Sequence, residues 1–339
     1  MDLVYNTFVM QSIAGNGCRM KEVALMNTYR GKHVSSSPWQ SSSPSSSLRR
    51  GRHQVKNRHR RRWLIAGVIL LVLLFSWPLI EARLLQTERT VLKAEDLPLE
   101  ANNLRIVYLS DIHYGFWFSD GDLGRLVAKI NNLRPDLVLF GGDYATDNQS
   151  AIRFFHALQQ QDTLHSRYGI YGVIGETDRG DSDFTCTQLT EAMANAGVTP
   201  LVNKSVPVNI ATRQIFIAGV DDVLTGRPDM KAVSRSVKAE DFVIFMSHNP
   251  SVIPDAQLAT DASGNLGWFD LGLFGHTHGG QMLFFSSLLG LDEDVPDRYR
   301  SGWLKENRVD LLISRGVGTS VYPGRLFCFP QIHYMEITY

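Results

Sequence analysis

Short apolar runs recur through the C-terminal two-thirds of the chain, and each ends in polar or glycine residues. Five of them are residues 104–115, 136–144, 169–178, 241–250 and 270–280. Each run is rich in β-branched or aromatic side chains and is bounded by turn residues, which is typical of strands. Residues 213–220, 308–316 and 332–339 follow the same pattern. The chain is therefore predicted to contain a strand in each of these eight runs.

Two segments between these runs have helical periodicity instead. Within residues 120–136 one face carries Leu123, Leu126, Val127, Ile130 and Leu133, and Pro135 lies just beyond the predicted end. Within residues 185–197 one face carries Leu189, Ala192, Met193 and Ala196, and Gly197 is the expected stop. Strands and helices thus alternate in the first half of this body, which predicts an α/β fold with parallel strands.

The segment from Trp63 to Ile80 contains 18 residues without a charge. This is about the minimum length for a helix that spans a bilayer. Residues 49–62, which precede it, hold eight Lys/Arg and no acidic residue. By the positive-inside rule we expect one membrane pass, with the N-terminus in the cytoplasm and the C-terminal domain outside it. A cleaved signal peptide is the less favoured reading, because no A-x-A-like site follows.

Charge divides the chain into a basic leader and an acidic body. Residues 1–62 hold 12 Lys/Arg and two acidic residues, whereas the remainder holds 22 and 32. The leader includes a Ser/Pro-rich stretch, residues 35–47, that cannot form a core, so residues 1–62 are predicted to be disordered. We expect a linker over residues 81–96 and one domain over residues 97–339. The Arg-rich flank is explained by the membrane segment, so no nucleic-acid partner is expected.

The polar residues at the strand ends are carboxylates and imidazoles. They are Asp111, His113, Asp143, Glu176, His248, His276 and His278. A single such residue is usually a cap or a loop hydrogen bond, but parallel strands bring all their C-terminal ends to one edge. Acidic residues gathered there would repel one another unless cations compensated them. Mixed oxygen and nitrogen ligands suit Mn, Fe or Zn, and six or seven of them predict two divalent metal ions rather than one.

The ordered motifs D-x-H, GGD, G-x-x-D, SHNP and GHTHGGQ resemble those of the calcineurin-like metallophosphoesterases, including membrane-anchored bacterial members. The resemblance covers about residues 104–339. It implies two mixed β-sheets sandwiched between helices. It also implies that Asp111, His113 and His278 hold a first metal. His248 and His276 would then hold a second, with Asp143 bridging the two.

One loop departs from the family pattern of Gly-Asn-His-Asp/Glu, in which the Asn binds metal and the His assists the leaving group. Here it reads Gly175-Glu176-Thr177-Asp178. Glu176 keeps an oxygen ligand but adds a negative charge, and Thr177 removes a group that titrates near neutral pH. Asp178 and Thr177 are then the catalytic candidates in this loop. Arg325 is a candidate substrate-binding residue, although a structural arginine is an equal alternative.

These observations predict a membrane-anchored, metal-dependent hydrolase of phosphoesters. The substrate would be a phosphodiester or pyrophosphate, including lipid-linked esters such as UDP-diacylglucosamine-like molecules. The alternative is a non-catalytic membrane protein that binds metal, a phospholipid or a phosphosugar. The Glu176-Thr177 pair supports that alternative, whereas the intact ligand set speaks against it.

Overall fold

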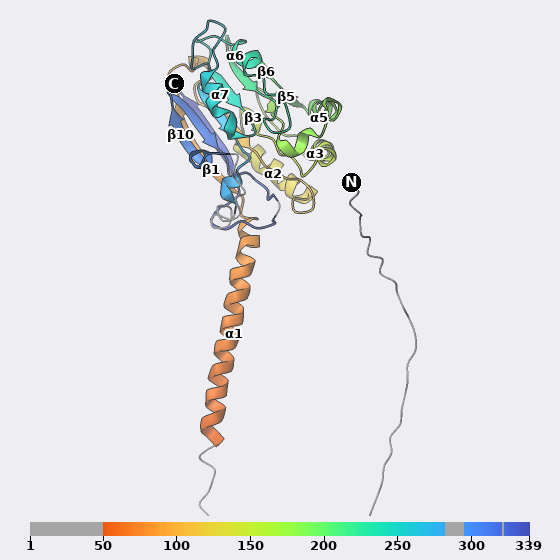
Figure 1. The fold of residues 1–339 in the computed structure, drawn as a ribbon, viewed down its shortest axis with the longest axis vertical. Coiled ribbons are helices and arrows are strands. Elements are labelled where there is room, and N and C mark those ends of the chain that lie inside the picture. The colour runs from red at the N-terminus through yellow and green to blue at the C-terminus, as the bar shows by residue number, and fades with distance from the viewer. Residues whose placement is uncertain (1–49, 282–294, 321) are drawn as a thin grey trace, which may run out of the picture. The chain divides into compact units, whose positions relative to one another are not determined.

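The computed structural model describes residues 50–281, 295–320 and 322–339. Its first element is α1, Arg50–Glu81, drawn in orange in Figure 1. This helix contains the predicted membrane segment and begins at Arg50, so residues 50–62 are helical and the prediction of disorder was wrong there. The part of the leader before Arg50 lies outside the described residues. Residues 58–81 of α1 form a helical segment that is long and apolar enough to cross a membrane.

Twelve strands in the described residues form two six-stranded sheets. The first has the order β1-β12-β2-β3-β4-β5 and the second the order β10-β11-β9-β8-β7-β6. The strands of the first sheet are β1 Gln86–Lys93, β2 Leu104–Leu109, β3 Leu137–Phe140, β4 Ile170–Gly172, β5 Val198–Pro200 and β12 Gln331–Thr338. Those of the second sheet are β6 Lys204–Ile210, β7 Arg213–Gly219, β8 Val243–Met246, β9 Leu271–Phe274, β10 Gly302–Glu306 and β11 Val309–Ile313.

Both sheets are mixed. β2 to β5 run parallel to one another, as do β7, β8, β9 and β11, whereas β12, β6 and β10 each make an antiparallel pair. All eight strands predicted from the apolar runs are present. The predicted linker was wrong in part, because residues 86–93 form β1 and pair in parallel with β12 along its whole length.

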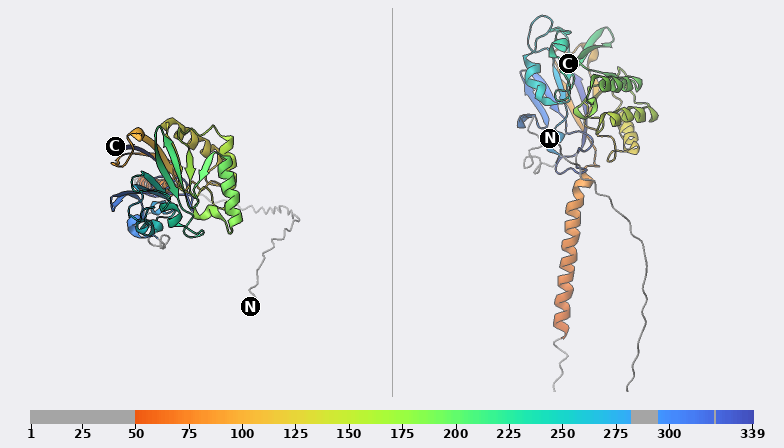
Figure 2. Two further views of the ribbon diagram at one scale, coloured as in Figure 1. Left: turned by 90° about the horizontal axis from the view of Figure 1, so that it is seen from above. Right: turned by 45° about the vertical axis from the view of Figure 1, so that its right-hand side comes forward.

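Helices cover the outer faces of the two sheets. The α-helices after α1 are α2 Asp120–Leu133, α3 Asn148–Gln160, α4 Glu176–Arg179, α5 Asp183–Asn195, α6 Met230–Ser234 and α7 Ile253–Leu258. Short 3-10 turns are η2 Leu99–Ala101, η3 Pro250–Val252, η4 His278–Gly280 and η5 Asp297–Tyr299. Seen from above, the strands lie between the yellow and green helices on one side and the cyan helices on the other (Figure 2).

Alternation of side chains along the strands divides the core into three layers. In β2, Val107 and Leu109 face the cluster that includes α2, α3 and α5, whereas Ile106 and Tyr108 face the second sheet. The third cluster lies behind the second sheet and includes Phe245, with α6 and α7 contributing residues. The result is the predicted arrangement of two sheets between helices. It places the carboxyl ends of strands from both sheets close together.

Candidate metal centre

The candidate ligands follow four parallel strands of the two sheets. Asp111 and His113 come after β2, Asp143 after β3, His248 after β8, and His276 and His278 after β9. A hydrogen bond from the His276 N–H to Asp111 Oδ1 (2.9 Å) connects the two sheets at these ends. Within the second sheet, the Gly275 N–H donates to the His248 carbonyl (2.9 Å). The site therefore lies where both sheets end, which is where open α/β sheets place their ligands.

Five of these residues have left-handed backbone conformations. They are Asp111, His113, Asp143, His276 and His278, with φ between 47° and 71°. Non-glycine residues adopt this region rarely, and such strain gathers at functional sites. Glycines make the close approach of the loops feasible: a Cβ on Gly275 would lie 2.7 Å from Asp111 Oδ2. The backbone is thus bent so that the ligand side chains turn toward one another.

One group of converging ligand atoms is formed by Asp111, His113 and His278. The Nε2 atoms of the two histidines are 2.9 Å apart, and His278 Nε2 is 3.6 Å from Asp111 Oδ1. The two rings are stacked, with centroids 4.9 Å apart. Two imidazole nitrogens this close need a proton between them or a cation that both contact. The group matches the first metal site implied by the family resemblance.

A second group consists of Asp111, Asp143 and His248. His248 Nε2 lies 3.4 Å from Asp143 Oδ2 and 4.0 Å from Asp111 Oδ1. Its other ring nitrogen, Nδ1, lies 2.8 Å from the carbonyl oxygen of Gly141. A carbonyl only accepts, so Nδ1 carries a proton, and Nε2 is the ring atom that faces the carboxylates. This is the outer-sphere arrangement that prepares a histidine for metal binding.

Charge and burial within this cluster shift the pKa values of its members. Burial opposes ionisation of Asp143, but His248 and His113 outweigh it and lower the pKa of the carboxyl group. Burial also opposes protonation of His248, whereas Asp143 and Asp111 raise its pKa well above the ordinary value. The pKa of His278 is lowered well below its ordinary value by burial and then by His113 and Arg325. The carboxylates thus attract positive charge, whereas burial and the neighbouring His113 and Arg325 disfavour protonation of His278.

Two independent observations indicate that these residues are suited to bind divalent cations. His248 Nε2 is buried and makes no hydrogen bond, although it faces two carboxylates. The donor set combines carboxylate oxygens with imidazole nitrogens, and no cysteine belongs to either group of ligands, which suits Mn, Fe or Zn. These two groups are therefore the part of the site that could hold metal ions.

His276 and Glu176 lie at the open side of the cluster. Glu176 Oε2 is 3.9 Å from His276 Nδ1, and their side chains are 43% and 20% exposed. Burial, followed by His248, lowers the pKa of His276. Neither residue belongs to the two converging groups, so the structure brings five of the seven predicted ligands together and places these two beside them.

Thr177 and Asp178 support the site from α4, the single turn of helix that follows Gly175. The Thr177 N–H and hydroxyl both reach Asp143 Oδ1 (3.1 and 3.0 Å), and the hydroxyl is also 2.6 Å from the Ala145 carbonyl. Asp178 is fully buried and accepts hydrogen bonds from the N–H groups of Tyr144, Ala145 and Gly175. Burial and then Asp143 raise the pKa of Asp178 to about 8, although the N–H groups of Gly175 and Ala145 and the charge of His248 act to lower it. Thr177 and Asp178 therefore hold Asp143 and the neighbouring backbone in position. Asp178 does not lie at the open side of the cluster.

Arg325 lies behind His278 and is fully buried. Its guanidinium donates to the carbonyl of Gly318 (2.6 and 2.9 Å) and to that of Cys328 (3.3 Å). Nη2 also lies 3.4 Å from His278 Nδ1. The prediction that Arg325 contacts substrate does not fit this position, and the structural alternative does.

Three supporting residues were not anticipated from the sequence. The Ser110 hydroxyl donates to Asp111 Oδ2 (2.5 Å), and the Cys328 thiol to the His278 carbonyl (3.1 Å). Glu81 accepts from the Cys328 N–H (2.6 Å). A hydroxyl beside the strand-end Asp was a usable signal for Ser110. For Glu81 the sequence offered one signal, which is that it is the first acidic residue after the apolar segment.

Two sheets that end in a cluster of Asp and His residues define the class of metal-dependent phosphoesterases. The sequence profile of the calcineurin-like phosphoesterase family matches residues 104–280, just over half of the chain. The chain therefore belongs to the calcineurin-like phosphoesterase family, and it is a phosphoric ester hydrolase. The predicted family and enzyme class are confirmed.

Relatives span most of the described domain. The chain is 27% identical over 258 residues to the uncharacterized metallophosphoesterase YkuE of Bacillus subtilis, covering 75% of this chain and 85% of that protein. It is 27% identical over 235 residues to the phosphodiesterase YaeI of Escherichia coli, covering 69% and 82%. It is also 31% identical over 199 residues to a transmembrane protein with metallophosphoesterase domain of Danio rerio, covering 56% and 43%.

Proposed function

We propose that this protein is a membrane-anchored phosphodiesterase or pyrophosphatase with a dinuclear metal centre. The observation that carries the proposal is the convergence of five ligand residues into two groups that share Asp111. The relationship to a named phosphodiesterase supports the reaction class. Lipid-linked phosphoesters are the substrates most compatible with an apolar helix that leads directly into the domain.

Each side chain has a defined task in this proposal. Asp111, His113 and His278 hold one cation, and Asp111, Asp143 and His248 hold the other. Bound cations of this kind acidify a water molecule and neutralise phosphoryl oxygens. Thr177 fixes Asp143, while the Gly141 carbonyl fixes the His248 ring in the tautomer that leaves Nε2 free. His276 and Glu176, at the open side, lie where a phosphoester would approach.

The Glu176-Thr177 pair influences which esters are cleaved. The described loop offers no imidazole that would protonate a departing alkoxide, and phosphoryl transfer through a loose transition state needs little such help when the leaving group is a weak base. We therefore propose that nucleotide-like or pyrophosphate leaving groups are cleaved faster than alkoxides.

The test uses the full chain purified in a neutral detergent, reconstituted in turn with Mn, Fe, Zn and Mg. Hydrolysis of phosphomonoesters, phosphodiesters and pyrophosphates would be compared with that of the His248→Gln variant. The proposal expects about two metals per chain and a diester or pyrophosphate activity that the variant lacks. A wild-type protein that binds metal but cleaves no ester would favour the binding-protein alternative.

Membrane anchorage and orientation are tested separately in cells. We propose that α1 crosses the membrane with the Arg-rich flank in the cytoplasm. The protein should then stay in the pellet after carbonate extraction, and a reporter fused after Tyr339 should be active only outside the cytoplasm. Labelling of that C-terminus by a cytoplasmic reagent in intact cells would contradict this orientation.

A further inference from the structure

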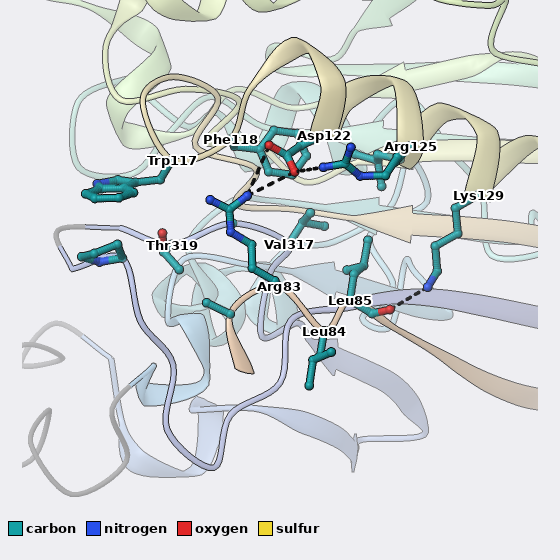
Figure 3. A pocket seen from close by; sticks show the side chains of 14 residues that line it. Arg83, Leu84, Leu85, Trp117, Phe118, Asp122, Arg125, Lys129, Val317 and Thr319 are labelled. Atoms are coloured by element: carbon teal, nitrogen blue, oxygen red, sulfur yellow. Dashed lines mark hydrogen bonds and ion pairs between the residues drawn. The ribbon is translucent and has the colours of Figure 1, made fainter. Parts of the chain in front are cut away.

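A cavity of about 350 Å³ lies directly after the last turn of α1. Three segments line it: the chain that leaves α1, the loop and helix around α2, and a third segment that contributes Val317, Gly318, Thr319 and Pro323. Figure 3 shows the side chains that matter most, which are Arg83, Leu85, Trp117, Arg125, Lys129 and Val317. None of the residues identified above as metal ligands lines this cavity.

The cavity has an excess of positive charge. Arg83 lies 3.3 Å from Asp122 Oδ1, and Arg125 shares the same carboxylate oxygen (Figure 3). The Lys129 ammonium donates to the Leu85 carbonyl (2.6 Å) and has no carboxylate within ion-pair distance in the described part of the chain. The lining therefore holds three cations and one carboxylate, and only Arg83 and Arg125 contact that carboxylate. The side chains of Arg83 and Arg125 are 57% and 74% exposed, so both remain open to an anion from outside.

Apolar side chains form the rest of the lining. Leu85, Phe118 and Val317 pack on the core, whereas Leu84 and Trp117 are each 45% exposed. Next to the cavity, Phe116 is 88% exposed and makes an edge-on contact with Trp117, with ring centroids 4.7 Å apart. Exposed aromatic rings beside cations are typical of the zone where a bilayer meets water.

The position along the chain sets the depth of these groups. The uncharged segment ends at Ile80, and Arg83 follows three residues later, with its N–H still donating to the Ile80 carbonyl (3.0 Å). At about 1.5 Å per helical residue, Arg83 lies within about 5 Å of the end of the apolar segment. If the segment crosses a membrane, this is the depth of the lipid phosphates.

We propose that this cavity binds the head group of an anionic phospholipid. The juxtaposition of Arg83, Arg125 and Lys129 would receive the phosphate, and Leu85 and Trp117 would contact the start of an acyl chain. The inference rests on the proposed membrane anchorage of α1 but requires no catalytic role for the metal centre. Val317 and Gly318 form one wall of the proposed lipid site. Their N–H groups donate hydrogen bonds to the carbonyls of Ser110 and Asp111.

The test measures lipid selectivity of the full chain in a neutral detergent. The protein is incubated with equal amounts of phosphatidylglycerol and phosphatidylcholine that carry a photoactivatable group near the glycerol. After illumination, the ratio of attached lipids is measured and the attachment sites are mapped. The expected sites are residues 82–85, 117–129, 317–319 and Pro323, with phosphatidylglycerol preferred.

Two matched variants isolate the cavity. The test variant combines Arg83→Gln, Arg125→Gln and Lys129→Gln. The control combines Lys231→Gln, Arg235→Gln and Lys238→Gln, three exposed cations around α6 that do not line the cavity. Both keep the Arg-rich flank, so its attraction for anionic lipids is the same in each. A cation near lipid phosphates is worth about fivefold in binding, so the preference should fall by at least about fivefold in the test variant alone.

Several outcomes would overturn the inference. An unchanged preference in the test variant would do so, as would attachment confined to other segments. If glycerol phosphate competed as well as phosphatidylglycerol, the cavity would recognise phosphate rather than lipid. Arg125→Glu, at a side chain that is 74% exposed, provides the same comparison if the triple variant does not fold. Unchanged hydrolysis of an aryl phosphodiester by these variants would separate loss of lipid binding from failure of the proposed enzyme.

Discussion

The carboxylate of Glu81, the last residue of α1, accepts a hydrogen bond of 2.6 Å from the backbone N–H of Cys328. Its second oxygen accepts from the indole N–H of Trp77 (2.9 Å), and the Cys328 thiol donates to the His278 carbonyl. Nearby, the Pro78 carbonyl accepts from the Arg325 N–H (2.9 Å). The end of the apolar helix is therefore bonded to the loop that supports a candidate metal ligand.

We expect Glu81→Ala to lower the free energy of unfolding by about 1–3 kcal/mol, because it leaves the buried Cys328 N–H without an acceptor. Glu81→Gln should cost less, since the amide oxygen still accepts. Denaturant unfolding of the full chain in detergent measures both, with Glu95→Ala, at an exposed site, as the control. Equal stability of Glu81→Ala and the control would show that this bond contributes nothing.

Asp143→Ala should reduce bound metal by at least about one ion per chain. The carboxylate lies 3.4 Å from His248 Nε2 and 3.6 Å from His113 Nε2, so its loss removes an oxygen ligand between the two groups. Elemental analysis of purified protein provides the measurement. The exposed Asp255→Asn is the control and should retain the wild-type content. Wild-type metal content in Asp143→Ala would contradict the assigned ligand set.

Thr177→Val should lower kcat/KM about 10- to 100-fold, as expected when a partner that orients a metal ligand is lost. The hydroxyl bond to Asp143 disappears, whereas the backbone N–H bond from the same residue remains. Thr177→Ser restores the hydroxyl and should recover most of the activity. If the Val variant is as active as the Ser variant, the hydroxyl bond to Asp143 contributes nothing to catalysis.

Glu176→Asn should increase turnover of diesters at subsaturating concentration. The change removes a negative charge 3.9 Å from His276 Nδ1 at the open side, where a phosphoester anion approaches. Weaker repulsion should show mainly as a lower KM, and less strongly at high salt because the side chain is exposed. A lower activity together with lost metal would instead make Glu176 a ligand.

Asp270→Asn should stabilise the protein more at pH 8 than at pH 4. Burial raises the pKa of Asp270 to about 7, more than the hydrogen bond from the Val243 N–H lowers it, and Asp96 adds to the rise. The folded form therefore binds this proton more tightly than the unfolded chain, whose carboxyl titrates near pH 4. Stability from this group is full below about pH 4 and is lost as the pH rises through 7. Asn cannot ionise, so its advantage should appear above that range in melting temperatures measured across pH.

Much of the fold could be predicted from the local pattern of apolar and polar residues. The eight predicted strands, the helix Asp120–Leu133 and the two-sheet arrangement agree with the structure, because apolar periodicity reports which face of an element is buried. β1 was missed because an edge strand with alternating exposed side chains looks like a linker. Its partner, β12, is the last strand of the chain, so no local signal indicates the pairing.

The sequence by itself determined which side chains lie at the strand ends. The carboxyl ends of parallel strands meet at one edge of a sheet, so the residues that follow these strands come close together. The sequence therefore indicated Asp111, His113, Asp143, His248 and His278 as neighbours. Only the tertiary structure decided that Arg325 is buried behind His278, that Thr177 holds Asp143, and that Glu81 reaches Cys328. These contacts join residues 34 to 247 positions apart. Their partners are selected by how separate loops pack, which neither periodicity nor motif spacing encodes.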